Sequence, residues 1–422
     1  MTSAVSTEAS GSAESIEQIY RAEWGRLLSL LVSRTRRLHV AEDALGEAFA
    51  RAAERWPVDG FPANPAGWLY TTSHRQIVGR LRAESIAGRK APLLAVRPDW
   101  VPPGDPLEQL EVLADERLHL ILLCCHPALP PQSRSGLALR LVIGTPTDQI
   151  ARLFLVSPPT MAARLTRAKK KIAVAGIPLG APVEDELRLR LDEVCRTIYL
   201  AFTAGYTPGT GPDLLRADLA TDAVRLAALL HDLVPDAPQV QAMLALLLLQ
   251  HSRREARLSD GRLVTLPEQD RSRWKNHEIA GGLQIIDRVQ PTTGYAEELR
   301  LQALIAGEHA KATTAEATDW AAIAGHYATL ETRTGSAVVR LNRAVAVAEA
   351  DGPGAGLALL TGLDEVLAGN HRLFAVRADL AQRADDVELA QASFRAALEL
   401  CGNEIERQHL EHRLAELESP NP

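Results

Sequence analysis

Apolar residues recur at three- and four-residue steps along nearly the whole chain, and this periodicity constrains the fold more than any other feature. It is plain between residues 16 and 56, where Leu27, Leu28 and Leu31 follow it, and Pro57 is expected to stop the second helix of this stretch. Such spacing places apolar side chains on one face of an α-helix. Aromatic residues make up only 4% of the chain, so the cores must be built largely from Ala and Leu, the strongest helix formers. Apart from a short hairpin arm that residues 262–266 could form, no stretch is convincingly strand-rich, and we expect an all-α fold.

The chain offers no candidate for a membrane span or a secretory signal. Its longest apolar run, residues 242–249, is far shorter than the ~20 residues that a spanning helix needs. The N-terminal residues lack the basic start and the apolar core of a signal peptide. Four cysteines in 422 residues are too few for a disulfide framework. We therefore expect a cytoplasmic protein without membrane association.

Charge is distributed unevenly between the two ends of the chain. Residues 1–176 hold 22 Lys and Arg against 17 Asp and Glu, a net charge of +5, whereas residues 177–422 hold 24 against 36, a net charge of −12. A basic front part indicates a polyanionic partner for that part alone. An excess of this size is also compatible with an ordinary solvated surface.

Residues 147–172 have the pattern of a helix-turn-helix. A short amphipathic helix is followed by a tight turn in which Ser157 can cap, and Pro158 can begin, a second helix. That helix has an apolar face expected to be buried, formed by Met161, Leu165, Ala168 and Ile172. Its outer face carries Arg164, Arg167, Lys169, Lys170 and Lys171. The arrangement is typical of a helix that enters the major groove, although a charged outer face on an ordinary helical hairpin would have the same pattern.

Side chains near the start of this helix are placed to meet base edges, and those further along to meet phosphates. Thr160 and Ala163 are candidates for base contacts, and Arg164 could reach a guanine edge. Arg167 and Lys170 are candidates for phosphate contacts that set the register. The full set of expected contacts is Ser157, Pro159, Thr160, Ala163, Arg164, Arg167 and Lys170.

The order of several motifs resembles the extracytoplasmic-function (ECF) RNA polymerase sigma factors. Residues 147–172 resemble sigma region 4, with a T-x-x-x-R-x-x-R-A-K pattern at 160–169, and AEDALGEAFARAAERWP at 41–57 and NPAGWLYTTSHRQIVGRLR at 64–82 resemble two helices of sigma region 2. The stretches at 122–144, 198–209 and 251–274 resemble the subgroup with a long, tetratricopeptide-like C-terminal extension.

The resemblance implies functional roles for three sets of residues. The helix that contacts core polymerase would present Glu42, Asp43, Glu47 and Arg51. A base flipped out of the −10 element would enter the loop from Phe61 to Asn64, and Trp68, His74, Arg75, Arg80 and Arg82 would hold the melted strands and their phosphates. Residues 99–116 hold six acids and no Lys or Arg. This acidic linker is either a solvated tether or, as the resemblance implies, a segment that passes through the polymerase's RNA exit path.

The C-terminal part has an internal period. Trp320, Gly354 and Val387 each begin a predicted pair of helices, at spacings of 34 and 33 residues. A period near 34 with two helices per unit is typical of tetratricopeptide repeats, which bind protein or peptide partners. The expected divisions of the chain are a disordered N-terminus (1–15), sigma region 2 (16–90), the acidic linker (91–116), sigma region 4 (117–178), a helical extension (179–318) and the repeats (319–418).

Two groups of residues resemble chemical sites without matching an established pattern. Cys124, Cys125 and His126 have no second Cys/His pair at zinc spacing, and two buried cysteines beside a capping histidine is the simpler interpretation. A charged cluster comprises His251, Arg253, Arg254, Glu268, Asp270 and Arg271. It is interpreted as an ion-pair network that closes a loop, with an active site as the alternative. We expect no metal, no cofactor and no enzymatic activity.

The sequence therefore predicts a sigma factor that binds core RNA polymerase and promoter DNA, with a C-terminal extension that regulates it. The acidic C-terminal part could clasp the basic DNA-reading faces. A stand-alone regulator that uses only residues 147–172 remains open, as do a scaffold in which the repeats are the main function and a hydrolase around His251.

Overall fold

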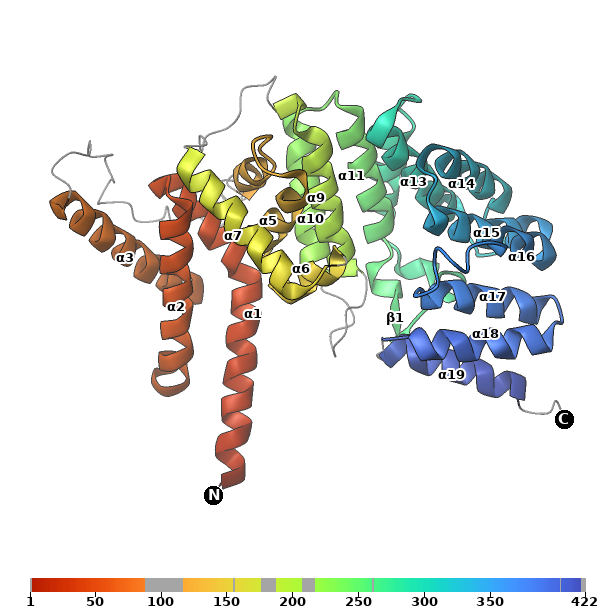
Figure 1. The fold of residues 1–422 in the computed structure, drawn as a ribbon, viewed down its shortest axis with the longest axis horizontal. Coiled ribbons are helices and arrows are strands. Elements are labelled where there is room, and N and C mark those ends of the chain that lie inside the picture. Colours follow the sequence, from red (N-terminus) through yellow and green to blue (C-terminus); the bar gives the residue numbers. More distant parts are fainter. Residues whose placement is uncertain are drawn as a thin grey trace. The chain divides into compact units, whose positions relative to one another are not determined.

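Strong helix formers and well-placed breakers divide the chain into short amphipathic helices in a computed structural model. The structure describes residues 2–87, 117–154, 156–175, 187–206, 217–259, 262–402 and 404–418. Within these ranges the protein is all-α apart from one hairpin of two-residue strands (Figure 1). The chain divides into two compact units, residues 1–201 and 202–422.

The first unit contains the helices of both expected sigma regions and a helix of the expected helical extension. They are α1 (Thr2–Thr35), α2 (Leu38–Asp59), α3 (Pro65–Ala87), the helical residues 117–124, α5 (Pro131–Leu141), α6 (Thr147–Leu153), α7 (Pro158–Ala175) and most of α9 (Leu191–Tyr206). Helices α1, α2 and α3 pack against one another. Leu28, Leu45 and Leu69 are fully buried in their core, and Trp24 lies against Phe49 with ring centroids 6.0 Å apart.

Two boundaries in this unit differ from the sequence expectations. Helix α1 begins at Thr2, so that residues 2–15 are helical where disorder was expected; the Ala and Glu residues among them are good helix formers. Helix α2 continues through Pro57, which was expected to stop it, and ends at Gly60, whose φ is 87°. A proline close to the C-terminus of a helix removes only one of the last hydrogen bonds. The left-handed conformation at Gly60, which glycine adopts without steric cost, then ends the helix.

Among its described residues, the second unit begins with an extension of four helices and three short 3₁₀ turns. Its elements are α10 (Ala217–Leu233), α11 (Pro238–His251), η1 (Arg254–Ala256), β1 (Leu258–Ser259), β2 (Arg262–Leu263), η2 (Leu266–Glu268), η3 (Arg271–Arg273), α12 (Asn276–Ile286) and α13 (Gly294–Lys311). Strands β1 and β2 pair antiparallel at the position of the expected hairpin arm. Helix α11 packs against α10, α12 and α13.

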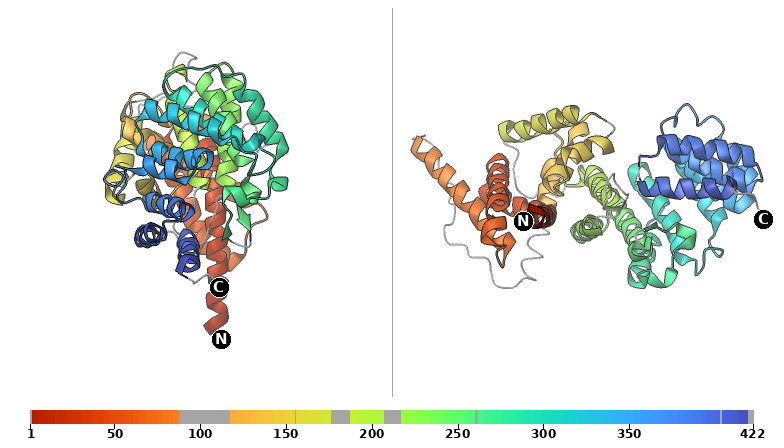
Figure 2. Two further views of the ribbon diagram at one scale, coloured as in Figure 1. Left: turned by 90° about the vertical axis from the view of Figure 1, so that its right-hand side faces the viewer. Right: turned by 90° about the horizontal axis from the view of Figure 1, so that it is seen from below.

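The described residues from Trp320 to Glu418 form three helix pairs, which begin at or next to the positions given by the sequence period. They are α14 (Trp320–Thr334) with α15 (Ala337–Asp351), α16 (Pro353–Leu360) with α17 (His371–Arg383), and α18 (Val387–Leu400) with α19 (Glu404–Glu418). Each helix packs against the next along the chain (Figure 2). A Cβ on Gly356 would lie 2.6 Å from the Cβ of Ala348, so the small residues allow α15 and α16 to approach closely.

Among the described residues, no helix combines the length and the apolar character needed to cross a bilayer.

Candidate nucleic-acid interface

Helix α7 begins in the manner that its sequence predicts. The backbone N–H of Thr160 lies 3.4 Å from the Ser157 hydroxyl oxygen, and the two hydroxyl groups are 2.8 Å apart. The apolar face is buried, with Met161 0% and Leu165 4% exposed. The Met161 side chain packs beside Gly136 of α5, since a Cβ on that glycine would lie 3.4 Å from its sulfur. These contacts fix the helix so that its opposite face is directed outward.

Most of the side chains expected to contact DNA from α7 lie on this outward face. Ser157, Pro159, Thr160, Ala163, Arg167 and Lys170 are exposed, and Arg164 is half-buried. The Arg167 Nε–H donates a hydrogen bond to the carbonyl oxygen of Ala163 at 3.2 Å. The structure therefore brings these residues together along one side of α7, where only Arg164 is partly covered.

Lys169 departs from the predicted solvent-facing arrangement. Its ammonium group forms an ion pair with the carboxylate of Glu42 on α2. Only 30% of the Lys169 side chain and 16% of the Glu42 side chain are exposed. The pair connects the expected DNA-reading helix to the helix expected to contact polymerase.

The packing of α1 against the end of α5 connects the same two regions. A Cβ on Gly25 would overlap the carbonyl oxygen of Val142, so the backbones approach closely there. Trp24 lies next to Gly144, whose φ is 75°, and the guanidinium of Arg140 lies 5.8 Å from the centre of the Trp24 ring.

The loop between α2 and α3 is shaped by aromatic contacts and a helix cap. The ring centroids of Phe61 and Trp68 each lie 5.4 Å from that of Trp56, while Phe61 remains 42% exposed. The Asn64 side chain accepts a hydrogen bond from the backbone N–H of Gly67 at 2.8 Å. Asn64 therefore caps α3, a role that the sequence interpretation did not assign to it.

His74 differs from the arginines with which it was grouped. Its ring stacks on Tyr70 with centroids 5.7 Å apart. Burial, and secondarily the charge of Arg34, lower the pKa of His74 below its ordinary value of 6.5. A neutral imidazole can stack on a base or form a hydrogen bond, but it adds no charge for binding phosphate. Arg75 and Arg82 lie exposed on the same helix.

The acidic face of α2 binds an arginine of α3. Arg80 forms ion pairs with Glu47 and, at 3.7 Å, with Asp43. Asp43, Glu47 and Arg51 are exposed. The structure thus joins two sets that the sequence interpretation kept apart, the expected −10 contacts and the expected polymerase contacts. The acidic linker (91–116) lies outside the described residues.

The charged cluster near His251 is an ion-pair network, but its acid is a different residue. His251 Nδ1 lies 3.1 Å from both carboxylate oxygens of Glu278, and Arg254 donates to the same carboxylate at 2.8 Å. The hydroxyl of Thr221 lies 3.2 Å from His251 Nε2. His251 is 3% and Glu278 8% exposed. The sequence signal that could have indicated this pairing is a histidine at the end of the apolar helix α11 together with an acid early in the next helix.

The other members of the expected cluster have separate roles. Glu268 accepts a hydrogen bond from the Thr265 hydroxyl at 2.8 Å, and Asp270 caps η3 by accepting from Ser272 N–H at 2.9 Å. Arg271 donates to the carbonyl oxygens of His309 and Ala312, at 2.6 and 2.7 Å. Arg253 is half-buried.

Cys124, Cys125 and His126 are arranged as two buried cysteines beside a histidine that bonds to the backbone. Both thiols are buried, and burial raises the pKa of Cys125 to about 12. Its sulfur lies 3.6 Å from the Thr197 hydroxyl, and the Nδ1 atom of His126 accepts a hydrogen bond from the backbone N–H of Ala128 at 3.1 Å.

Comparisons with known protein families cover both units. Residues 19–86 match the model for sigma-70 region 2, residues 119–172 the model for sigma-70 region 4, and residues 190–290 the model for a family of unknown function. The last match contains the His251–Glu278 network. No solved structure matches the chain.

Two curated relatives resemble the chain, and one of them is named as a probable sigma factor. "Uncharacterized protein R00370" of Rhizobium meliloti is 37% identical over 92% of this chain and 93% of its own length. "Probable RNA polymerase sigma factor RfaY" of Xanthomonas campestris pv. campestris is 29% identical over 52% of this chain and 49% of its own length. A region 2 helical domain followed by a region 4 helix-turn-helix defines a sigma-70-type factor of transcription initiation. The chain belongs to the ECF-like sigma factors with a C-terminal extension, in one family with R00370.

Proposed function

We propose that the protein binds core RNA polymerase through α2, reads the −35 element with α7 and engages the melted −10 element with α3 and the loop before it. The observation that carries this proposal is the outward face of α7, where a capped helix start and basic side chains share one accessible surface. The work is binding and strand separation, without covalent chemistry.

At the −35 element, helix α7 enters the major groove with its N-terminal residues against base edges. Thr160 and Ala163 contact bases, Arg164 reaches a guanine edge, and Arg167 and Lys170 contact phosphates that fix the register. Ser157 and Pro159 lie at the start of the helix, where the backbone approaches the duplex. The proposal requires these side chains to be accessible, and the exposure of α7 supports it.

At the −10 element, Phe61 and Asn64 border the position of the flipped base, and Trp68 supports the loop through Trp56. Aromatic rings stack on unpaired bases, and Phe61 has an exposed ring for that purpose. Arg75, Arg80 and Arg82 contact the strands, while His74 acts as a neutral group.

The polymerase surface is the acidic face of α2, formed by Glu42, Asp43 and Glu47 with Arg51 at its edge. Arg80 and Lys169 occupy parts of this face through intramolecular ion pairs. We therefore expect polymerase and DNA to take over these charges when the complex forms.

The helix pairs α14 to α19 bind a protein or peptide partner and regulate initiation, because stacked helix pairs of this kind present extended surfaces for such partners. A stand-alone helix-turn-helix regulator with the same partner-binding part is the alternative. It would use α7 and leave the charged face of α2 without a function.

Run-off transcription with purified core polymerase and genomic DNA tests the proposal. The wild-type protein should initiate at defined sites, and a variant with Arg164→Ala and Arg167→Ala should lose most of that activity. Arg152→Ala is the matched control, because Arg152 lies on the neighbouring helix α6 and pairs only locally with Asp148 at 2.9 Å in the described contacts. No initiation by the wild-type protein without a second sigma factor would favour the stand-alone regulator.

Charge-neutralising changes on α2 separate polymerase binding from DNA binding. The double variant Asp43→Asn, Glu47→Gln should weaken copurification with core polymerase. Asp148→Asn, which removes an exposed acid from α6, should not. Equal copurification of both variants would contradict the assignment of α2 as the polymerase surface.

A further inference from the structure

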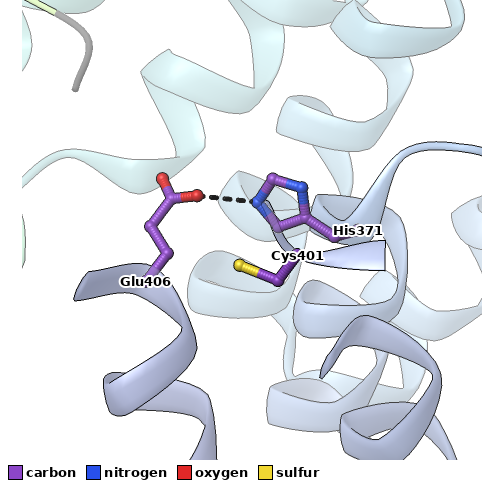
Figure 3. A group of neighbouring side chains, drawn as sticks. All are labelled: His371, Cys401 and Glu406. Carbon is purple, nitrogen blue, oxygen red and sulfur yellow. Dashed lines mark hydrogen bonds and ion pairs between the residues drawn. The ribbon is translucent and has the colours of Figure 1, made fainter. Parts of the chain in front are cut away.

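Three side chains with metal-binding atoms converge at the end of the second unit. His371 begins α17, Cys401 follows the last residue of α18, and Glu406 lies in the first turn of α19. Their ligand atoms all lie within 4.8 Å of one another. Figure 3 shows the imidazole and the carboxylate facing each other, with the sulfur beside them; His371 Nε2 and Glu406 Oε2 are 2.8 Å apart.

We propose that His371, Cys401 and Glu406 form a binding site for a zinc-type divalent transition metal. Imidazole nitrogen, thiolate sulfur and carboxylate oxygen are the three ligand types that zinc takes in proteins, at about 2.0–2.3 Å. Ligand atoms around a tetrahedral ion at those distances lie roughly 3–4 Å from one another. The observed separations therefore need only small side-chain movements. The hard cations calcium and magnesium prefer sites made entirely of oxygen, so the donor set favours zinc.

The cysteine of the cluster is buried, and the histidine and the glutamate are partly exposed. Cys401 is 2% exposed and belongs to an apolar cluster with Phe394, Ala397 and Leu410, so it lies among apolar side chains. The His371 and Glu406 side chains are 23% and 21% exposed, so both remain in contact with solvent.

Two arginines form hydrogen bonds with Cys401 and Glu406 outside the cluster. The guanidinium of Arg407 donates to the carbonyl oxygen of Cys401. Arg372 donates to Oε1 of Glu406 at 3.4 Å, which leaves Oε2 toward the cluster. Such outer partners orient the ligands of metal sites. Since the three ligands come from three helix ends, a bound ion would tie α19 to α17 and α18.

Cobalt(II) titration of the purified, tag-free full-length protein under reducing conditions tests the site. A tetrahedral cobalt ion with a thiolate ligand gives intense visible bands and a near-ultraviolet charge-transfer band. Both should saturate at a single equivalent per chain, and zinc(II) should displace the cobalt and abolish them. In Cys401→Ser the charge-transfer band should disappear. In His371→Ala and Glu406→Gln the affinity for cobalt should fall by more than ~10–100-fold. That range is the cost of losing a residue that only hydrogen-bonds to a metal ligand.

His412→Ala is the matched control. His412 lies on α19 but is 73% exposed and faces Glu416 at 3.3 Å, so this variant should bind cobalt as the wild type does. A wild-type spectrum without a charge-transfer band would overturn the proposal. So would cobalt binding that survives in Glu406→Gln and His371→Ala unchanged. The wild-type spectrum decides the question even if the Cys401 variant fails to fold.

Discussion

Glu278→Gln tests whether the buried network at His251 holds α11 and α12 together. The substitution keeps the shape of the side chain and removes its negative charge. Glu278 begins the buried face of α12, with only 10% of its side chain exposed, and it receives hydrogen bonds from His251 and Arg254. Neutralising it leaves the guanidinium of Arg254 without this carboxylate.

The expected cost follows from the burial of each partner. Hydrogen bonds to charged groups contribute about 1.5–3 kcal/mol each, and breaking a fully buried ion pair costs about 3–5 kcal/mol. The Gln oxygen still accepts one hydrogen bond, and the Arg254 side chain is 25% exposed, so water recovers part of the loss. We expect the free energy of opening of this region to fall by about 2–4 kcal/mol.

Hydrogen exchange of the full-length protein measures that free energy locally, without requiring the two units to unfold together. Amides of α11 and α12 should exchange roughly 30- to 700-fold faster in Glu278→Gln, since about 1.4 kcal/mol corresponds to a factor of ten. Glu255→Gln, in η1 next to Arg254, is the matched control. Its carboxylate pairs with Lys275 at 2.6 Å but is 49% exposed, and exposed pairs contribute little. Equal protection of both variants would refute the role of the network.

The pH dependence of hydrogen-exchange protection is a second test of the role of the Glu278 carboxylate. Burial raises the pKa of Glu278, but the hydrogen bonds and charges of His251 and Arg254 outweigh burial and lower it below its ordinary value of 4.5. A lowered folded-state pKa stabilises the protein above the unfolded value, and the stabilisation is lost as the pH falls through the folded value. The difference in protection between wild type and Glu278→Gln should therefore be constant above pH 4.5 and shrink below it.

Three further predictions concern the first unit. Gly25→Ala should destabilise the contact between α1 and the end of α5 by about 1–3 kcal/mol through overpacking, and hydrogen exchange should be faster there. Gly46→Ala should not have this effect, because its Cβ would meet nothing within 4 Å. Ser157→Ala should destabilise the start of α7 by about 1 kcal/mol and weaken −35 binding, whereas Ser157→Asp should preserve the cap; equal exchange in both variants would contradict the capping role. His74→Gln should leave the salt dependence of holoenzyme binding to promoter DNA unchanged, because the pKa of His74 is lowered, while Arg75→Gln should reduce its slope by about one phosphate contact.

Helix periodicity predicted most of the fold because each helix carries its own apolar face. The starts of α14 and α18 at Trp320 and Val387 agree with the predicted repeat, since Asp319 and Asp386 cap them locally. The end of α2 was predicted less well. Pro57 removes one hydrogen-bond donor near the end of the helix, and the left-handed Gly60 determines where the helix stops.

The candidate site was predictable where it depends on neighbours in sequence, and not where it depends on packing. The cap at Ser157 and the buried face of α7 follow from local spacing. The pairing of Glu278 with His251 joins positions 27 residues apart, and no short motif encodes it. The same holds for Lys169 and Glu42, which are 127 residues apart in sequence.

The ion pairs of the first unit bear on how the two sigma regions would engage polymerase and promoter. Lys169 and Arg80 each neutralise acids of α2 that are proposed to face polymerase. The Arg80 pairs are partly exposed, and such pairs contribute only about 0–1 kcal/mol each, so polymerase can replace them at little cost. The Lys169–Glu42 pair has only 30% and 16% of its side chains exposed, so breaking it costs more. The contact at Gly25 is a close approach of backbone and involves no charged side chain. Separation of the two regions should therefore be limited by the packing of α1 against α5 together with the Lys169–Glu42 pair, and Gly25→Ala and Lys169→Ala should each make separation easier.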